Sequence, residues 1–418
     1  MTSRSFGRVS WVAFLLLALV AQLPAAEATR NTGPWDVKEL AKTPQIEWGA
    51  TNGLVREVYY SSEPFQGKPT RVFGYYARPA GEGPFPAMVL LHGGGGKAFP
   101  EWAKLWAERG YVALAMDLAG KGPAGKPLSD GGPGQDDTAK FGKFDDDHVK
   151  EMWTYHAVAA ALRGHSLLAA QKEVDAQRIG VTGISWGGYL TCIVAGVDER
   201  LKVAVPVYGC GFLQENSVWR SGYFDKMTEE QRHRWGKNFD PSSYLAGVSC
   251  PILFVNGTND FAYPLDSYQK SYHLVKEQLV DLCITVNMPH GHPQGWTPKE
   301  IGIFVDSVVN KGKPLPRFSE GELTRAEGQL KIVAEVPVVS AQFHYTTDEG
   351  PWQKRTWKTV DAKLAGDTVH AAFPEKFTVL FFTIRDERGA VASSDYIDLT
   401  RPVPAQTPMN PAVKVKND

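Results

Sequence analysis

Short, almost continuous apolar runs recur between residues 70 and 310, with helical patterns between them. The runs cover residues 85–93, 110–120, 178–184, 202–209, 251–257 and 282–288. Runs of this kind are typical of strands that are buried on both faces. The segments 101–109, 148–170 and 298–310 carry helical patterns. This alternation predicts a mostly parallel sheet covered by helices.

Two stretches do not follow the alternation. Residues 121–148 are rich in Gly, Pro and Asp, which predicts a long loop. Residues 211–247 carry Trp219, Tyr223 and Trp235 among charged residues. These aromatic side chains form either the core of a lid or the walls of a substrate cleft.

The pattern changes after the stretch 310–316. Short runs such as 330–336 and 377–384 are separated by turn signals, which predicts a small antiparallel β-sandwich. The break resembles a linker, so we expect that residues 317–418 can be removed without destroying a site that lies before them. The expected parts are a signal peptide at 1–28, an N-terminal segment at 29–69, a catalytic domain at 70–315, a β-sandwich at 316–400 and a tail at 401–418.

The N-terminus has the pattern of an export signal. Arg4 and Arg8 precede an apolar run at 11–23, and Ala26 to Ala28 give the small-x-small sequence that signal peptidases cleave. The run is short for a membrane span. We therefore expect a secreted or periplasmic protein whose mature chain begins near Thr29 and does not contact a membrane. An uncleaved anchor is the alternative.

Composition excludes several classes of protein. The chain is 43% hydrophobic and 22% charged, with a formal net charge of −1, as in ordinary globular proteins. No Lys/Arg block occurs, so nucleic acid is not an expected partner. The spacings of the four cysteines fit no zinc pattern, and we expect most of them to be free and buried. The acidic stretch 144–148 is more typical of a solvated face than of a metal site, so no metal or cofactor is implied.

The segment "VTGISWGGYL" at 181–190 contains the strongest chemical signal. Ser185 lies between Gly183 and Gly187, after an apolar strand and before an apolar helix. Strand–Gly-x-Ser-x-Gly–helix is the arrangement of a nucleophile elbow, in which glycines allow a tight turn. The helix N-terminus behind the serine favours developing negative charge. We therefore expect Ser185 to be a catalytic nucleophile.

Serine needs a base, and the elbow arrangement expects the chain order Ser, acid, His. Asp260 follows the strand at 251–257, and His290 and His292 follow the strand at 282–288. Strand ends at one edge of a parallel sheet share one crevice. Asp266 is the alternative acid. His290 is favoured over His292 as the base because Gly291 follows it, whereas Pro293 restricts His292.

An oxyanion requires two backbone N–H donors. Trp186, directly after the nucleophile, supplies one of them. We expect the other from Gly94, in the run of four glycines that follows His92. Glycine loses conformational entropy on folding, so four in a row suggest a backbone that curls around a substrate oxygen. We expect His92 itself to pack or hydrogen-bond rather than to catalyse.

With "LHGGGG", "VTGISWGGYL", "VNGTNDFAYP" and "MPHGH", residues 70–310 resemble the α/β-hydrolases. The resemblance is to the branch of dienelactone hydrolases, prolyl oligopeptidases and acetyl xylan esterases. It implies the α/β-hydrolase fold, here with a small C-terminal β-sandwich, and a Ser185–Asp260–His290 triad. This chain departs from the family patterns at two positions. Dienelactone hydrolases carry cysteine as nucleophile where this chain has Ser185. At the position of Trp186, acetyl xylan esterases usually have Gln and prolyl oligopeptidases often have Tyr.

The leading hypothesis is an exported serine esterase that acts on acyl groups of a carbohydrate or a similar small ester, through an acyl-enzyme. A serine peptidase of the prolyl oligopeptidase type, acting on short peptides, is the alternative. We expect no propeller before the hydrolase segment, which argues against the peptidase hypothesis. A non-catalytic binding protein on the same fold is a third hypothesis, and the intact order Ser, Asp, His argues against it.

Overall fold

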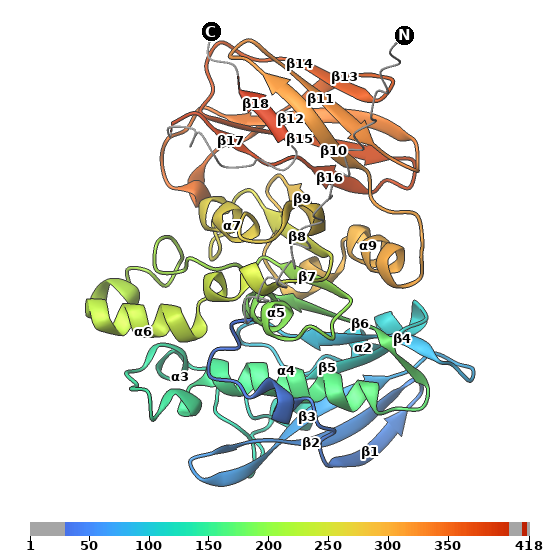
Figure 1. The fold of residues 1–418 in the computed structure, drawn as a ribbon, viewed down its shortest axis with the longest axis vertical. Coiled ribbons are helices and arrows are strands. Elements are labelled where there is room, and N and C mark those ends of the chain that lie inside the picture. The colour runs from blue at the N-terminus through green and yellow to red at the C-terminus, as the bar shows by residue number, and fades with distance from the viewer. Residues whose placement is uncertain (1–29, 401–411, 416–418) are drawn as a thin grey trace, which may run out of the picture. The chain divides into compact units, whose positions relative to one another are not determined.

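The structure is a computed structural model that describes residues 30–400 and the backbone of residues 412–415 (Figure 1). Contacts divide the chain into two units, Met1–Arg30 and Asn31–Asp418, and the second contains every element discussed below. The segment expected to be a signal peptide lies outside the described residues. Within the described part of the chain, no helix is both long and apolar enough to cross a membrane.

A nine-stranded mixed sheet has the strand order β1-β2-β3-β5-β4-β6-β7-β8-β9. Its strands are β1 (Ile46–Asn52), β2 (Val55–Phe65), β3 (Lys68–Ala77), β4 (Phe85–Leu91), β5 (Val112–Met116), β6 (Val174–Ile184), β7 (Val203–Val207), β8 (Ile252–Gly257) and β9 (Val280–Thr285). Strands β4 to β9 pair in parallel. Every residue of β5, β7 and β8 is buried. The parallel sheet predicted from the apolar runs is therefore confirmed.

Strands β1 and β2 extend this sheet, although the sequence analysis placed all of their residues in the N-terminal segment at 29–69, outside the catalytic domain. They pair antiparallel with each other, and β2 pairs antiparallel with β3. Burial in β2 is mixed along the strand, and only Val58 and Tyr60 are fully buried. A half-buried edge hairpin gives a weaker hydrophobic signal than a buried parallel strand, which is why the apolar runs did not reveal it.

Helices cover the sheet. They are α1 (Val37–Leu40), α2 (Pro100–Glu108), α3 (Asp137–Phe141), α4 (Trp153–Ala169), α5 (Trp186–Val197), α6 (Glu229–Phe239), α7 (Leu265–Tyr272), α8 (His292–Trp296) and α9 (Lys299–Val309). Helices α4 and α5 contact each other and β6, and both lie in front of the sheet in Figure 1. Helices α2, α4 and α9 confirm the helical patterns in the sequence. All twelve residues of α5 are buried, so the helix behind Ser185 is fixed by packing.

A second sheet begins at residue 317 and has the order β16-β15-β12-β13-β14-β11-β10-β18, with β17 paired to β15. Its strands are β10 (Arg317–Leu323), β11 (Glu327–Val333), β12 (Val338–Thr346), β13 (Lys358–Ala365), β14 (Thr368–Ala372), β15 (Val379–Asp386), β16 (Val391–Ser393), β17 (Ile397–Asp398) and β18 (Ala412–Val415). All pairs are antiparallel except β10 with β18. The small C-terminal β domain is therefore confirmed. Strand β18 lies in the segment that was expected to be a loose tail.

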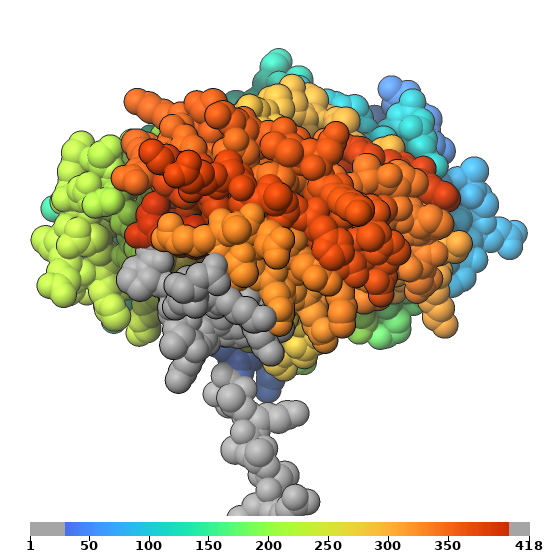
Figure 2. Space-filling model, turned by 90° about the horizontal axis from the view of Figure 1, so that it is seen from above, coloured from blue at the N-terminus to red at the C-terminus, as the bar shows by residue number. Residues whose placement is uncertain are grey.

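The C-terminal sheet shares an apolar cluster with the first sheet. Trp352, Trp357, Phe381 and Tyr396 belong to the same buried cluster as the strands of that sheet. The residues of the C-terminal sheet, orange to red in Figure 2, form a continuous surface on the face shown there. The C-terminal sheet also has a buried cluster of its own, which includes Phe343 and Phe382. The break at 310–316 therefore joins two cores that pack against each other through the shared aromatic residues.

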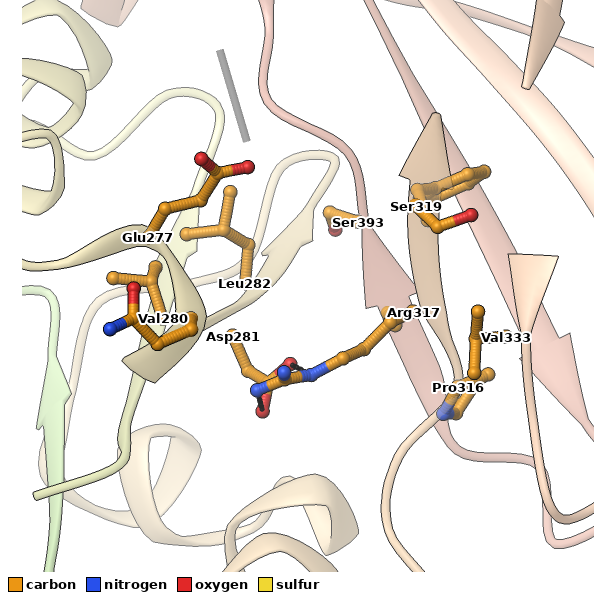
Figure 3. A pocket seen from close by; sticks show the side chains of 12 residues that line it. Glu277, Val280, Asp281, Leu282, Pro316, Arg317, Ser319, Val333 and Ser393 are labelled. Atoms are coloured by element: carbon orange, nitrogen blue, oxygen red, sulfur yellow. Dashed lines mark hydrogen bonds and ion pairs between the residues drawn. The ribbon is translucent and has the colours of Figure 1, made fainter. Parts of the chain in front are cut away.

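Polar contacts reinforce this junction. The backbone N–H of Ile284, on the edge strand β9, donates to Ser393 Oγ at 2.7 Å. Arg317 Nη2 donates to Asp281 Oδ2 at 2.7 Å, beside a pocket of about 400 Å³ between β9 and β10 (Figure 3). The buried carboxylate of Asp395 accepts hydrogen bonds from three side chains of the α7 region, Gln269, Tyr272 and His273.

None of the four cysteines forms a disulfide and all four are buried, which agrees with the sequence analysis. They are Cys192, Cys210, Cys250 and Cys283. Burial raises the pKa of the Cys192, Cys210 and Cys283 thiols. Thiols in this state behave as small apolar groups rather than as nucleophiles.

Candidate active site

Ser185 lies at the sharp turn between β6 and α5. Its φ of 59° and ψ of −117° are strained for a residue with a side chain. The turn is possible because its neighbours lack side chains. A Cβ at Gly183 would overlap the carbonyl of Gly187, and a Cβ at Gly187 would overlap the carbonyl of Leu91. The structure therefore places Ser185 in the elbow that the motif predicts.

Asp260 and His290 meet across two loops that follow adjacent strands, β8 and β9. His290 Nδ1 lies 2.6 Å from Asp260 Oδ2, and the carboxylate is fully buried. The other carboxylate oxygen accepts the backbone N–H groups of Ala262 at 2.9 Å and Tyr263 at 2.7 Å. These bonds fix the carboxylate, which in turn fixes the imidazole and its tautomer.

Asp266, the alternative acid, has a different environment. It lies in the first turn of α7 and accepts hydrogen bonds from Asn216 Nδ2 at 2.9 and 3.0 Å. The side chain of Asn216 thus links the stretch 211–247, which we call the lid segment, to α7 through this carboxylate. The geometry favours Asp260 over Asp266 as the partner of a catalytic histidine.

Aromatic rings surround the His290 imidazole. The ring of Tyr208 stacks on it with a centroid distance of 4.3 Å, and the ring of Phe261 lies 4.7 Å away. The hydroxyl of Tyr208 donates to Pro289 O at 2.7 Å, so this tyrosine also holds the loop that carries His290. Tyr208 itself adopts a positive φ of 66°. The sequence analysis did not single out Tyr208, because an aromatic residue at a strand end has no distinctive motif.

Tyr263 joins the acid loop to the nucleophile. Its backbone N–H donates to Asp260, and its fully buried hydroxyl lies beside the Ser185 side chain. Burial raises the pKa of Tyr263 well above its ordinary value, so the phenol stays protonated. The sequence analysis also missed this residue, although it lies only three positions after Asp260.

The two expected oxyanion donors flank the nucleophile. Trp186 is the first residue of α5, so its N–H has no partner within the helix. Among the described residues, the N–H of Gly94 makes no hydrogen bond. A Cβ at Gly93 would lie 2.9 Å from the Cβ of Ser185, which places the glycine loop directly against the nucleophile.

His292 lies at the start of α8, and its Nε2 accepts the backbone N–H of Gly93 at 2.9 Å. Its ring packs on Phe99 with a centroid distance of 4.8 Å. Burial lowers the pKa of His292 to about 4, with smaller contributions from His92 and His290. The structure therefore places His292 against the glycine loop, whereas His290 contacts the acid.

The aromatic residues of the stretch 211–247 differ in their surroundings: one lies in the core of the lid segment and another lies beside the nucleophile. Trp235 is buried in the lid core, and its indole N–H donates to Lys140 O at 2.9 Å. The half-buried Trp219 lies 4.4 Å from Trp186 and 5.2 Å from Tyr263, measured between ring centroids. Trp219 is therefore a wall beside the nucleophile. Tyr223 lines a hollow of about 340 Å³ in the lid.

Within residues 30–400, no group of three or more His, Cys, Asp or Glu side chains is arranged to hold a metal ion. Asp145 and His148, from the acidic stretch 144–148, pair with each other at 2.6 Å on the surface.

The family described as "Dienelactone hydrolase family" matches residues 72–293. Several curated proteins, including the following two, are similar to this chain. "Uncharacterized peptidase YuxL" of Bacillus subtilis is 26% identical, with coverage of 54% of this chain and 34% of that protein. "Acetyl esterase Axe7A" of Xylanibacter ruminicola is 22% identical, with coverage of 55% and 53%. The chain thus spans about a third to a half of the length of these relatives.

A solved structure shares the fold. The acetyl xylan esterase from Paenibacillus sp. R4 has a TM-score of 0.54 and 22% sequence identity, and the match covers 65% of this chain and 92% of that one. The match agrees with the α/β-hydrolase fold that the sequence predicts.

Proposed function

Because this chain belongs to the dienelactone hydrolase family, we propose that it is an exported serine hydrolase that cleaves an ester through Ser185, Asp260 and His290. The observation that carries the proposal is the 2.6 Å contact between His290 Nδ1 and Asp260 Oδ2 at the same sheet edge as the strained Ser185. With Nδ1–H donated to the carboxylate, Nε2 of the neutral imidazole is left without a proton and is ready to accept one.

In the proposed mechanism, Ser185 Oγ attacks the ester carbonyl carbon while His290 Nε2 takes its proton. Asp260 stabilises the imidazolium that forms. The carbonyl electron pair moves to oxygen, where the N–H groups of Trp186 and Gly94 stabilise it. When this intermediate collapses, the alcohol leaves with the proton from His290 and the acyl group stays on Ser185. Water, activated by His290, then releases the acid and restores the serine.

We favour an ester of a carbohydrate as the substrate. The aromatic side chains of Trp219 and Phe261 lie at the site, and Phe261 is 55% exposed beside His290. Exposed aromatic faces suit the apolar faces of sugar rings. The similarity to an acetyl esterase supports an acetyl group as the acyl part.

A serine peptidase is the second candidate, and the similarity to a protein named as a peptidase favours it. The same triad cleaves amides as well as esters, so the catalytic groups do not separate the two. Turnover of matched p-nitrophenyl ester and p-nitroanilide substrates separates the esterase from the peptidase. We expect turnover of short acyl esters, acetylated xylan oligomers among them, with little turnover of anilides. Faster turnover of peptide anilides would make the peptidase the better assignment.

The serine mechanism has a direct test. A fluorophosphonate probe should label the wild-type protein and fail to label Ser185→Ala, which should have lost turnover while keeping its circular dichroism spectrum and melting temperature. The hydroxyl is the only group removed, so the variant remains folded. Labelling of Ser185→Ala, or activity close to wild type, would refute the assignment.

Export is proposed from residues 1–28 alone. Expression of the full chain in a Gram-negative host, followed by N-terminal sequencing of the periplasmic fraction, tests it. A mature N-terminus near residue 29 is expected. A chain that stays in the cytoplasm with its first residues intact would overturn the proposal.

A further inference from the structure

Both polar groups of Gly93 are held by imidazoles. The N–H of Gly93 donates to His292 Nε2 at 2.9 Å. The carbonyl of Gly93 lies 2.7 Å from His92 Nδ1 and also accepts the N–H of Gly96 at 3.1 Å. His92 directly follows β4 and precedes Gly93. His292, at the start of α8, lies 199 residues after Gly93. Two separate parts of the chain therefore hold one glycine.

The hydrogen bonds require a defined tautomer of each histidine. His92 Nε2 accepts the backbone N–H of Leu118 at 2.8 Å, so the proton of a neutral His92 is on Nδ1 and is donated to Gly93 O. His292 Nε2 accepts from Gly93, so its proton is also on Nδ1. Burial lowers the pKa of both groups to about 4, which keeps both imidazoles neutral near pH 7.

These bonds determine where the next N–H points. Because a peptide group is planar and trans, the N–H of Gly94 is directed opposite to the carbonyl of Gly93. That carbonyl is turned toward His92 and Gly96, so the Gly94 N–H is turned away from them. Among the described residues it has no hydrogen-bond partner. An unpartnered N–H beside the nucleophile is what an oxyanion donor requires.

Close packing explains why residues 93 and 96 are glycines. A Cβ at Gly93 would lie 2.7 Å from Ile184 O and 3.1 Å from His292 Nε2. A Cβ at Gly96 would lie 2.7 Å from His92 Nδ1 and 2.8 Å from His292 Nε2. The two imidazoles and the glycine loop thus fit together without room for side chains.

We propose that His292 is a positioning residue that holds Gly93 through its N–H and so aims the Gly94 N–H at the oxyanion. This inference rests on the proposed function and deepens it. It also distinguishes two histidines that are separated by only one residue. His290 moves the proton, and His292 orders the donor that stabilises the charge.

His292→Phe keeps a ring against Phe99 but removes the acceptor for Gly93. We expect kcat for a p-nitrophenyl ester to fall by about 100-fold with little change in KM, because misplacing a catalytic group by about 1 Å costs about that much. A trifluoromethyl ketone, whose adduct with serine carries an oxyanion, should bind more weakly in proportion to kcat/KM. His292→Gln offers an amide oxygen to Gly93 and should recover most of the loss.

Pro293→Ala is the matched control. Pro293 is exposed, follows His292 directly and lies in the same short helix, so the change disturbs α8 without removing the bond to Gly93. We expect its kcat and its affinity for the ketone to stay near wild type. A loss in Pro293→Ala equal to that in His292→Phe would assign the effect to helix α8 as a whole and overturn the proposal.

The outcomes separate this inference from the proposed function. If the fluorophosphonate does not label the wild-type protein, both fail. If it labels the protein but His292→Phe keeps the wild-type kcat and ketone affinity, only the positioning role fails. If His292→Phe is as inactive as Ser185→Ala and His290→Phe is active, His292 is the base.

A measurement on the wild-type protein tests the hydrogen bond without relying on any variant to fold. With ¹⁵N-labelled histidine, NMR at neutral pH should show His292 as the neutral Nδ1–H tautomer, with Nε2 unprotonated. Either the Nε2–H tautomer or a doubly protonated ring would overturn the proposal, since neither accepts a hydrogen bond from Gly93.

Discussion

Deletion of residues 317–418 should leave a catalytic segment that does not fold stably, contrary to the expectation from the break at 310–316. The deletion removes Trp352, Trp357, Phe381 and Tyr396, which belong to the same apolar cluster as the first sheet. It also removes Asp395, which holds three side chains of the α7 region. Helix α7 follows the loop that carries the proposed acid.

The size of the effect follows from the buried area. Each aromatic side chain buries about 150–250 Å², so the four together bury about 600–1,000 Å². If half of that area lies against the first domain, the deletion exposes about 300–500 Å² of apolar surface. At about 25 cal/mol/Å², this corresponds to about 8–12 kcal/mol. Natural domains are stable by only about 5–15 kcal/mol, so the loss is comparable to the whole stability of the fold.

Expression of residues 29–316, compared with residues 29–418, tests this. We expect the shorter chain to be insoluble, or to bind a hydrophobic dye and unfold without a cooperative transition. Co-expression with residues 317–418 as a separate chain should restore solubility, because the missing surface is supplied again. A monomeric 29–316 fragment that melts cooperatively and keeps the activity of the longer chain would refute the reasoning.

Two further predictions concern single residues. Asp260→Asn should lower kcat by about 10⁴-fold, because the amide favours the wrong tautomer of His290, while Asp266→Asn should keep most of the activity. Steady-state kinetics of both variants checks this, and the reverse order of effects would identify Asp266 as the acid. The buried His344 has a pKa lowered by burial to about 4, against about 6.5 in an unfolded chain, so below pH 6.5 the unfolded state takes up a proton that the folded state does not. Its contribution to the free energy of unfolding therefore decreases as the pH falls from about 7 to about 5, by about 2 kcal/mol. Urea unfolding should show a smaller decrease for His344→Gln than for wild type, and equal decreases would contradict the lowered pKa.

The elbow, the acid and the favoured histidine could be predicted because each has a local signature at a strand end. Gly-x-Ser-x-Gly requires a tight turn, and Asp260 and His290 follow buried strands whose carboxyl ends lie at one edge of the sheet. The structure brings these two side chains together. The surroundings of His290 could not be predicted in the same way. Tyr208 and Phe261 come from different loops, and only the tertiary fold brings their rings onto one imidazole.

The junction of the two sheets was missed for a related reason. A proline- and glycine-containing segment after a helix resembles a linker whether or not the following domain packs back onto the preceding one. Several of the contacts that join the two sheets use backbone groups. Asn259, directly before Asp260, donates to the carbonyl of Arg355 at 2.6 Å, and Ile284 donates to Ser393. A main-chain group that donates or accepts such a bond leaves no pattern at its own position in the sequence.

The choice of histidine at position 292 has an electrostatic reason. The N–H of Gly93 needs an acceptor, which lysine and arginine cannot provide. A carboxylate could accept the bond, but its negative charge beside the glycine loop would oppose the oxyanion that forms on the substrate. A protonated side chain would oppose the imidazolium on His290, and the nearby His290 already contributes to the lowered pKa of His292. A neutral imidazole, with a pKa lowered to about 4, accepts the hydrogen bond and adds no charge of either sign. The same reasoning applies to His92 on the other side of Gly93, so the glycine loop is held from both sides by groups that add no net charge beside the nucleophile.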